Sequence, residues 1–514
     1  MKFLEKISPR KYQEEIFNTC KEKNCLVILS TGTGKTLIAL MLAIERKRKF
    51  PRSKILFLAP TRPLAEQHHN YFEKHLPELF AEMILFTGKI PAAQRKKLWQ
   101  TTEIIFSTPQ CISNDLKKGL YTLSEVSLLI EDECHRCLKN YSYTMVAEKY
   151  KQQGLNQRFL GLTASPGSEK EKINMICKNL SIEAIEIRTR DSEDVKEYLK
   201  ERKFQIVKLD FPKELEDLKI PLKKIYDSKV DELQRRKLLF NPITKRTLLE
   251  AQERIFRQIS TGNKNFNVLS GASACAMAIK IQHAIELLET QTLYSFHCYL
   301  QDLQEQARQE KSKAVKQLIN KPEFSYTMAK LHELLKKDIE NPKLQELVKI
   351  MKKEIKSKEK IIVFAQFRDT ITKICKTLNK ENIPSRVFIG QAKKTRREKT
   401  ELGLSQKEQK QVIRDFSDNQ FNVLCATSIG EEGLDIPEVN AVIFYEPIPS
   451  EIRKIQRAGR TARLVKGKLI ILLNKKTRDE AYYWSAFNKE KRMHKIIDKM
   501  KNGFSLKEEK QTKL

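Results

Sequence analysis

Short apolar runs, separated by longer stretches of mixed polarity, recur along this chain. A first set of runs covers residues 25–30, 54–59, 103–107, 127–131 and 158–163. After a long gap, a second set covers residues 360–365, 385–389, 421–426, 441–445 and 468–473. The stretches between most consecutive runs are long enough for crossover helices, and this alternation is typical of parallel sheets. The pattern therefore predicts an α/β fold class with two parallel-sheet domains.

Residues 191–349 follow a different pattern, because apolar runs nearly vanish there apart from residues 204–209. Residues 274–290 instead place small and apolar side chains at intervals of three and four, which is typical of a helix. We therefore predict a helical insertion over 191–349, between α/β domains over 1–190 and 350–490. Residues 491–514 are predicted to form a basic, partly disordered tail. Four prolines are predicted to separate the helices of the insertion: Pro221, Pro242, Pro322 and Pro342.

Composition narrows the class of protein. With 514 residues, of which 40% are hydrophobic, the chain is long enough for several packed cores. The longest apolar run, residues 37–44, is much shorter than the ~18–20 residues of a membrane span, and the N-terminus lacks a signal-peptide core. Ten cysteines over this length do not indicate a disulfide framework. We expect a cytoplasmic protein with no membrane partner.

Net charge gives a first indication of the partner. The chain carries 97 Lys and Arg against 65 Asp and Glu, a formal net charge of +32 at pH 7. This surplus favours a polyanion such as nucleic acid, although extra lysines also serve as a solubilising surface. Most of the surplus lies outside the nearly neutral insertion. The two α/β domains are therefore the predicted place of polyanion binding.

A glycine-rich segment follows the first apolar run and precedes the helical run 37–46. It reads Ser30, Thr31, Gly32, Thr33, Gly34, Lys35 and Thr36, with Leu29 where a Gly or Ala is usual. In a strand-to-helix context, the backbone N–H groups of such a turn point at phosphate oxygens. Lys35 is predicted to meet the β- and γ-phosphates, and the Thr36 hydroxyl to ligate Mg²⁺. The segment therefore predicts a nucleotide-binding site.

Two adjacent carboxylates stand at the end of the predicted strand 127–131. Asp132 is placed to hold Mg²⁺ through water, while Glu133 is placed to orient and deprotonate an attacking water. An adjacent Asp-Glu pair in isolation is usually a solvated acidic pair. Its position about a hundred residues after the glycine-rich segment favours the catalytic interpretation.

Further motifs resemble those of a superfamily 2 helicase, in the family's order, over both α/β domains. In the first domain, residues 9–13 resemble the Q motif, 59–64 motif Ia, 87–88 and 107–110 the small strand-contacting motifs, and 163–165 motif III. In the second domain, residues 362–368 resemble motif IV, 426–435 motif V and 456–463 motif VI. The resemblance implies two RecA-like domains, the helicase ATP-binding domain over 1–190 and the helicase C-terminal domain over 350–490.

A closer resemblance is to the archaeal Hef helicase and the Fanconi anaemia M-type DNA translocase. It is carried by residues 276–290, 403–410 and 477–485, which lie outside the general ATPase motifs. The helical insertion is also similar to that of the Dicer and innate-immune RNA helicases. Cys134 within Asp-Glu-Cys-His occurs in that RNA branch, so the RNA alternative stays open.

The resemblance implies ATP and Mg²⁺ as cofactors and assigns a role to further residues. Implied to be catalytic are Lys35, Asp132, Glu133, the water-placing Gln456 and the arginine fingers Arg460 and Arg463. Arg10 and Gln13 are implied to recognise adenine, Asp435 the ribose, and Thr36 and Asp132 the metal. Thr163, Ala164 and Ser165 are implied to couple ATP hydrolysis to nucleic-acid binding. Implied phosphate-backbone contacts are Arg62, Thr87, Gly88 and Thr108 in the first domain, and Arg368, Gly390, Gln391 and Thr427 in the second.

The resulting expectation is an ATP-dependent DNA helicase or translocase that acts on forked or branched DNA in repair and replication-fork processing. Hef proteins typically continue into a nuclease, so a separate nuclease partner is expected. The protein itself is expected in the cytoplasm of a prokaryote, namely an archaeon. One alternative is an RNA-stimulated ATPase of the Dicer or innate-immune type. The other is a non-catalytic nucleic-acid-binding scaffold, against which the intact ATPase motifs argue.

Two smaller patterns admit both a structural and a functional interpretation. Cys134 and Cys137 have the spacing of a zinc-binding pair, but no second pair stands at finger spacing, which favours buried structural cysteines. Tyr482, Tyr483 and Trp484 could stack on bases. Packing of these rings against the second domain is the favoured interpretation.

Overall fold

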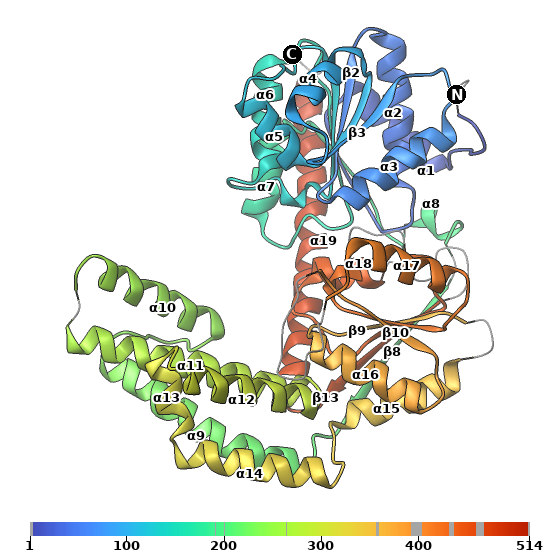
Figure 1. Ribbon diagram of the computed structural model, residues 1–514. Coiled ribbons are helices and arrows are strands. Elements are labelled where there is room, and N and C mark those ends of the chain that lie inside the picture. Colours follow the sequence, from blue (N-terminus) through green and yellow to red (C-terminus); the bar gives the residue numbers. More distant parts are fainter. Residues whose placement is uncertain are drawn as a thin grey trace.

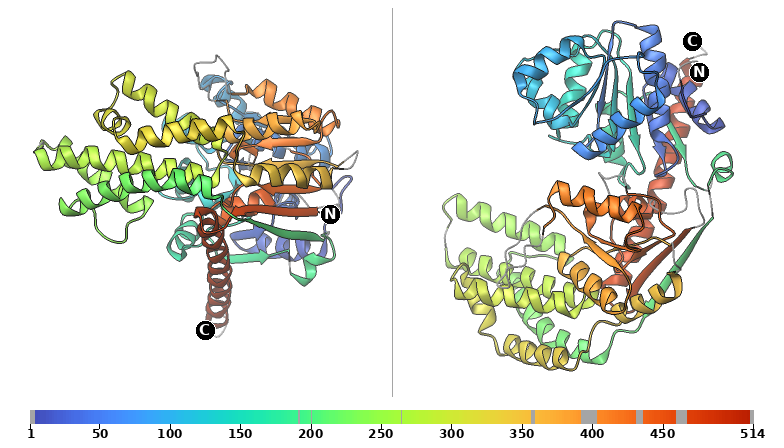
Figure 2. Two further views of the ribbon diagram at one scale, coloured as in Figure 1. Left: turned by 90° about the horizontal axis from the view of Figure 1, so that it is seen from below. Right: turned by 45° about the vertical axis from the view of Figure 1, so that its right-hand side comes forward.

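The structure is a computed structural model of the protein. The residues it describes are 4–190, 192–199, 201–263, 265–355, 359–391, 403–430, 436–458 and 467–511. They form two α/β domains, one above the other in Figure 1, with a helical insertion that projects from the lower, second domain. Figure 2 shows the insertion to one side of that domain.

The first domain contains a seven-stranded parallel sheet with the order β3-β4-β2-β5-β6-β1-β7. Its strands are β1 (Cys25–Leu29), β2 (Lys54–Leu58), β3 (Met83–Phe86), β4 (Ile104–Ser107), β5 (Val126–Asp132), β6 (Phe159–Thr163) and β7 (Ala184–Arg188). Its helices are α1 (Lys11–Glu22), α2 (Lys35–Lys49), α3 (Arg62–His75), α4 (Ala92–Thr101), α5 (Pro109–Lys117), α6 (Ser142–Gln153) and α7 (Lys170–Asn179).

The sheet of the first domain is buried on both faces, which explains its continuous apolar strands. Successive residues of β1 point to opposite faces, so Leu26 and Ile28 enter one core while Val27 and Leu29 enter the other. Helices α1, α2 and α3 cover one face, and α5, α6 and α7 cover the other (Figure 1). This arrangement fixes the carboxyl ends of the strands along one edge, where the loops of the site begin.

The second domain contains a six-stranded parallel sheet with the order β10-β11-β9-β12-β13-β8. Its strands are β8 (Arg202–Leu209), β9 (Ile361–Phe364), β10 (Ser385–Phe388), β11 (Val423–Ala426), β12 (Ala441–Phe444) and β13 (Gly467–Asn474). Helices α15 (Pro342–Glu354) and α16 (Arg368–Lys380) cover one face. The other face is covered by α17 (Gln406–Ser417), α18 (Glu451–Ala458) and the beginning of α19 (Arg478–Gln511).

In the described part of the helical insertion, six helices lie between β8 and α15. They are α9 (Lys213–Arg235), α10 (Lys245–Ser260), α11 (Phe266–Thr290), α12 (Leu293–Arg308), α13 (Lys313–Ile319) and α14 (Pro322–Lys336). Among the described residues, α11 alone has the length and apolar composition that crossing a membrane would require. However, 56% of its 18-residue apolar stretch is buried inside the protein, as in the core helix of a bundle.

The boundaries of the insertion differ from the predicted 191–349. β8 lies within that range but pairs with β13 at the edge of the second sheet, and Leu347 of α15 is buried in the core of the second domain. The helical bundle therefore spans residues 213–336. Pro221 lies inside α9 instead of separating two helices. Pro242 does fall between α9 and α10, and Pro322 and Pro342 occupy the first turns of α14 and α15, where a missing N–H costs nothing.

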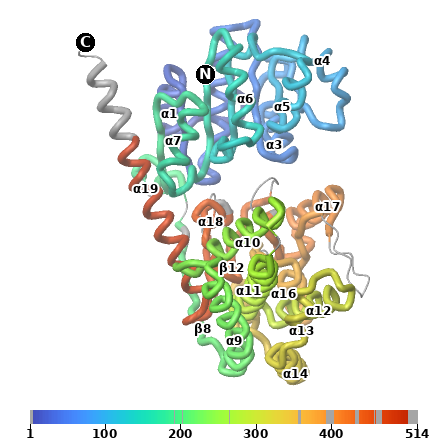
Figure 3. Tube along the Cα trace, turned by 90° about the vertical axis from the view of Figure 1, so that its left-hand side faces the viewer, coloured from blue at the N-terminus to red at the C-terminus, as the bar shows by residue number. Residues whose placement is uncertain are grey.

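The predicted disordered tail also differs from the structure, because α19 continues without a break from Arg478 to Gln511. It leaves the second domain and runs alongside the first, as the red helix in Figure 1 and Figure 3 shows. Met493 and Ile497, one turn apart, are buried in a core of the first domain. The lysine-rich composition of this segment conceals an apolar stripe that ties the two domains together.

Candidate nucleotide-binding and nucleic-acid-binding site

The glycine-rich turn between β1 and α2 has the backbone that the sequence predicts. Gly32 and Gly34 have φ angles of 85° and 84°, a region that side chains rarely adopt. A Cβ on Gly34 would lie 2.1 Å from Gln13 Nε2, so this position has no room for a side chain. α2 begins at Lys35, so the N–H groups of its first turn face the glycine-rich turn. The Lys35 ammonium donates to the Leu29 carbonyl at 3.0 Å.

The predicted adenine-binding segment, residues 9–13, forms hydrogen bonds with this turn. The Tyr12 hydroxyl donates to the Thr33 carbonyl at 2.6 Å, and Gln13 Nε2 donates to the same carbonyl at 3.1 Å. Gln13 is buried, and its Oε1 accepts from the Arg10 backbone N–H at 2.8 Å. The Arg10 guanidinium lies 5.0 Å from the ring centre of Tyr198. The segment therefore positions the loop and leaves Arg10 beside an aromatic ring.

The two predicted catalytic carboxylates emerge at the end of β5. Asp132 is 6% exposed and accepts a hydrogen bond from His68 Nε2, the two atoms being 2.8 Å apart. Burial alone would raise the pKa of Asp132, but the hydrogen bond from His68 and the charge of Lys35 hold that pKa below its usual value. Glu133 has a left-handed backbone, with φ 51°. Asp132 is therefore held ionised beside the turn.

His68 was not predicted from the sequence. It lies in α3, and its side chain is placed between Thr36 and Asp132, two of the predicted site residues. Its Nδ1 lies 3.4 Å from the Thr36 hydroxyl, and its other nitrogen contacts Asp132. Buried Ala65, His68 and Phe72 recur at intervals of three and four along α3. This spacing is the signal by which a histidine on the buried face of that helix could have been found.

The predicted coupling residues contact the predicted catalytic ones through His135. Its Nδ1 lies 3.2 Å from Glu133 Oε2 and 3.2 Å from the Thr163 hydroxyl. Thr163 in turn accepts from the backbone N–H of Ser165 at 3.1 Å. The Ser165 hydroxyl donates to the sulfur of Met493 in α19 at 3.0 Å. A continuous series of contacts therefore runs from the end of β5 to the helix that joins the domains.

Cys134 and Cys137 are both buried in the core of the first domain. Burial raises the pKa of each thiol. Within the described ranges, no group of three or more His, Cys, Asp or Glu side chains is arranged to hold a metal ion by itself.

Of the aromatic residues at the start of α19, Tyr483 packs in the second domain and Trp484 is half exposed. The Tyr482 hydroxyl donates to Glu286 of the insertion at 2.7 Å.

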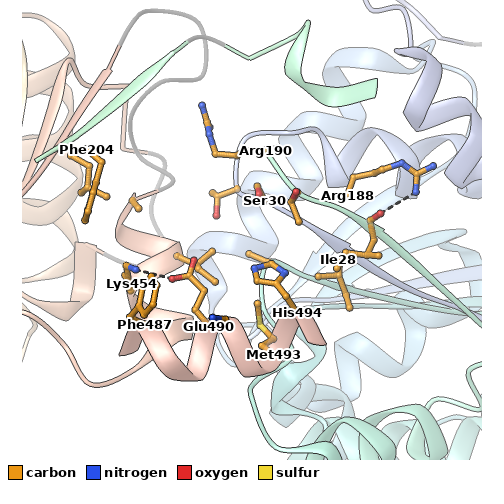
Figure 4. A pocket seen from close by; sticks show the side chains of 18 of the residues that line it. Ile28, Ser30, Arg188, Arg190, Phe204, Lys454, Phe487, Glu490, Met493 and His494 are labelled. Atoms are coloured by element: carbon orange, nitrogen blue, oxygen red, sulfur yellow. Dashed lines mark hydrogen bonds and ion pairs between the residues drawn. The ribbon is translucent and has the colours of Figure 1, made fainter. Parts of the chain in front are cut away.

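A cavity of about 540 Å³ lies between the two domains and α19 (Figure 4). The first domain contributes Ser30, Thr31 and Ala164 to its lining. The opposite wall includes Lys454 and Ala458 of α18, the helix that also contains Gln456. Lys454 Nζ donates to Glu490 of α19 at 2.7 Å. The glycine-rich turn thus faces the helix that leads to the predicted arginine fingers. Arg460, Arg463 and Asp435 themselves lie outside the described residues.

The predicted nucleic-acid contacts lie at the carboxyl ends of strands in both sheets. In the first domain, Arg62 begins α3, Thr108 precedes α5, and Thr87 and Gly88 follow β3. In the second domain, Arg368 begins α16, Gly390 and Gln391 follow β10, and Thr427 follows β11. Thr427 is only 6% exposed. A groove of about 300 Å³ between the domains is lined by Arg62, Lys89, Lys407, Lys410 and Arg414. Of the predicted set, Arg62 therefore borders this mainly basic groove.

Family models match three consecutive parts of the chain. Residues 10–173 match "DEAD/DEAH box helicase", and residues 342–465 match "Helicase conserved C-terminal domain". Between them, residues 213–341 match "Putative ATP-dependent RNA helicase, helical bundle". These ranges correspond to the two sheets and the helical bundle of the structure.

Several relatives match over nearly the whole chain. A protein named "Putative ATP-dependent RNA helicase" from Methanocaldococcus jannaschii is 39% identical over 96% of this chain and 61% of its own length. The ATP-dependent DNA helicase fml1 of Schizosaccharomyces pombe is 31% identical over 91% of this chain and 57% of its own length. The chain thus spans about three fifths of these relatives. The solved Hef helicase domain of Pyrococcus furiosus is 41% identical, covers 93% of this chain with 98% of its own length, and superposes with a TM-score of 0.69. The predicted resemblance and fold class are confirmed.

Proposed function

Because the chain belongs to the ATP-hydrolysing DEAD/DEAH box helicases, in the branch of the Hef helicase domain, we propose that it uses ATP hydrolysis to move along DNA. Forked or branched DNA is the proposed substrate. The observation that carries the proposal is the series of contacts from Glu133 through His135 and Thr163 to Ser165. This series joins the proposed water-activating carboxylate to the residues proposed to sense nucleic acid. A protein that only binds nucleotide would not need such a connection.

Mg²⁺ and ATP fit the side chains at the end of β5 and the start of α2. Oxygen atoms are the ligands that Mg²⁺ prefers, and the Thr36 hydroxyl and the Asp132 carboxylate both contact one imidazole, that of His68. A bound Mg²⁺ would neutralise charge on the phosphates. The N–H groups at the start of α2 would donate to phosphate oxygens.

The chemical roles follow from these positions. Glu133 is proposed to take the proton of the attacking water, and Lys35 to leave the Leu29 carbonyl for the phosphates. Arg460 and Arg463 are proposed to stabilise charge in the transition state once the cavity between the domains closes, with Gln456 placing the water. Asp435 is proposed to bind the ribose, and Arg10 and Gln13 the adenine. The three coupling residues would transmit the change between the two sites.

Phosphate contacts from both domains would then let the chain move without reading sequence. Arg62 and Arg368 are the charged members of the proposed set, and both stand in the first turn of a helix. Binding of this kind weakens steeply with salt. A separate nuclease partner and an archaeal, cytoplasmic setting also remain part of the proposal; the similarity to proteins of Methanocaldococcus jannaschii and Pyrococcus furiosus supports the latter.

An RNA-stimulated ATPase is the second candidate, because one family model and two relatives carry RNA helicase in their names. The DNA helicase names of other relatives favour DNA. A non-catalytic scaffold is disfavoured by the intact turn and carboxylates.

The deciding experiment measures ATPase rates of the full chain with matched forked DNA, linear duplex DNA and double-stranded RNA. We expect the largest stimulation by the fork, and stimulation by RNA alone would overturn the proposal. Glu133→Gln is the matched control, and it should bind ATP and DNA while hydrolysing ATP about 10²–10⁴-fold more slowly, the usual loss for a general base. Near-normal turnover by this variant would contradict the assignment of Glu133.

A further inference from the structure

His68 joins three elements of the site although it belongs to none of the predicted motifs. It projects from α3, and its two ring nitrogens contact Thr36 at the start of α2 and Asp132 at the end of β5. The side chain is 7% exposed, and its ring lies 4.4 Å from the ring of Phe57, centroid to centroid. Packing therefore fixes the plane of the imidazole, and with it the direction of both nitrogens.

The hydrogen bonds of His68 determine which nitrogen carries the proton. A carboxylate oxygen accepts hydrogen bonds, so the 2.8 Å contact with Asp132 Oδ2 places a hydrogen on His68 Nε2. In a neutral imidazole the other nitrogen is then an acceptor. The hydrogen of the Thr36 hydroxyl accordingly points toward His68 Nδ1, 3.4 Å from the hydroxyl oxygen. We assign this tautomer from the partners of the ring.

This arrangement has a consequence for both oxygen ligands. A Thr36 hydroxyl whose hydrogen is directed at His68 keeps its oxygen lone pairs available to a cation. An Asp132 carboxylate with Oδ2 held by His68 has a fixed orientation and keeps Oδ1 available. We infer that His68 is a positioning residue that orients the Thr36 hydroxyl and the Asp132 carboxylate toward a divalent cation bound with the nucleotide. The inference rests on the proposed ATP and Mg²⁺ site and adds to it a residue outside its motifs.

The alternative is that His68 only fills space in the core of the first domain. A phenylalanine would fill that space and keep the contact with Phe57, but it could not contact Thr36 or Asp132 through hydrogen bonds. Comparison of His68→Phe with the wild type therefore separates packing from hydrogen bonding. Outer hydrogen-bond partners of metal ligands typically contribute 10–100-fold to metal affinity.

The test titrates Mn²⁺, a paramagnetic substitute for Mg²⁺, into the full chain with a non-hydrolysable ATP analogue and follows binding by electron paramagnetic resonance. His68→Phe should weaken Mn²⁺ binding about 10–100-fold. Nucleotide affinity measured in EDTA should stay unchanged. The matched control is His69→Ala on the same helix, whose side chain contacts Glu73 instead. It should leave Mn²⁺ affinity unchanged.

Two polar variants keep the inference testable if His68→Phe does not fold. His68→Gln places an amide N–H near the position of Nε2 and should retain most of the Mn²⁺ affinity, whereas the shorter His68→Asn cannot reach Asp132 and should not. Wild-type Mn²⁺ affinity in a folded His68→Phe variant, or equal affinities in the Gln and Asn variants, would overturn the inference.

A further variant, Asp132→Asn, separates this inference from the proposed function. It should abolish Mn²⁺ binding, and full binding by this variant would overturn the inference and the metal site together. A chain that hydrolyses ATP with RNA instead of forked DNA would leave the Mn²⁺ results unaffected, since they involve no nucleic acid.

Discussion

The contact of the second domain with the helical insertion and its contact with α3 of the first domain are of opposite kinds. Beside the helical insertion, Lys343 Nζ of α15 pairs with Asp479 of α19 at 2.7 Å within the second domain, and both side chains are fully buried. Where it meets the first domain, Lys410 of α17 pairs with Glu66 of α3 at 2.9 Å, and these side chains are 52% and 31% exposed. A buried charge pair must keep its geometry, whereas an exposed pair exchanges readily with water.

Further buried hydrogen bonds extend the junction with the insertion. Lys343 Nζ also donates to the Thr290 carbonyl at 2.7 Å, and the side chain of Asn474 donates to the Glu289 carbonyl at 2.9 Å. The Thr370 hydroxyl of α16 donates to Gln291 at 2.8 Å. Elements from both ends of the second domain thus hold the end of α11. The insertion is therefore held to the second domain by buried groups, whereas the contact between α3 and α17 is exposed to solvent.

The largest expected effect comes from breaking the buried pair. Lys343→Ala would leave Asp479 buried without its partner; burial already raises the pKa of Asp479 to about 6, against the opposing charge of Lys343. We expect a loss of about 3–5 kcal/mol in the free energy of unfolding, measured by urea denaturation. The double variant Lys343→Met with Asp479→Leu is the control and should lose much less. Equal losses in the two variants would mean that packing, not charge, holds the junction.

Acid should weaken the same junction in a defined pH range. Burial raises the pKa of Glu286, but hydrogen bonds from His283, Lys245 and Tyr482 outweigh it and lower that pKa to about 2. Because the folded pKa lies below the unfolded value of 4.5, the stabilisation is present above pH 4.5 and is lost as pH falls toward 2. The full contribution is on the order of 3 kcal/mol.

The Glu286→Gln variant isolates this contribution. The difference in unfolding free energy between wild type and Glu286→Gln should shrink as pH falls from 4.5 toward 2. A difference that does not change with pH would show that Glu286 stabilises the junction by shape alone.

The smallest expected effect concerns the exposed pair between the domains. Lys410→Ala should change the free energy of unfolding by less than about 1 kcal/mol. It removes a direct tie between α3 and α17, so the distance between two spin labels, one in each domain, should become more widely distributed at low salt. At 1 M salt, where charges are screened within ~3 Å, the distance distributions of the variant and the wild type should coincide.

The matched control is Lys407→Ala, which replaces an exposed lysine of α17 that lines the same groove. An equally broadened distribution in the control would remove any special role of Lys410.

The strands inside the two sheets were predicted from their apolar runs, and so was the edge strand β10, whereas the edge strands β3, β7 and β8 were missed or misplaced. β1 is buried at all five positions, so its apolar run was visible in the sequence. β3 and β7 were missed: both are partly exposed edge strands, the apolar run of β3 is only four residues long, and Glu186 interrupts that of β7. β8 was noticed as a run but assigned to the insertion, since its partner β13 lies far away in the sequence.

The site divides in a similar way. The glycine-rich turn and the adjacent Asp132 and Glu133 are contiguous in sequence, so spacing alone could locate them. His68 and Met493 join the site through tertiary packing from α3 and α19, and no local pattern marks their partners. Residues whose function depends on contacts between distant segments need the structure.

The pairing of β8 with β13 also determines when the second sheet can be completed during synthesis. Arg202 pairs with Gly467 and Leu209 with Asn474, so each pair joins residues 265 positions apart. At a ribosomal rate of about 5–20 residues per second, β8 waits roughly 13–50 s for its partner. The first domain waits longer still, because Ile497 enters its core only after β13 has been made. Neither domain can therefore complete its core before the C-terminal helix has left the ribosome.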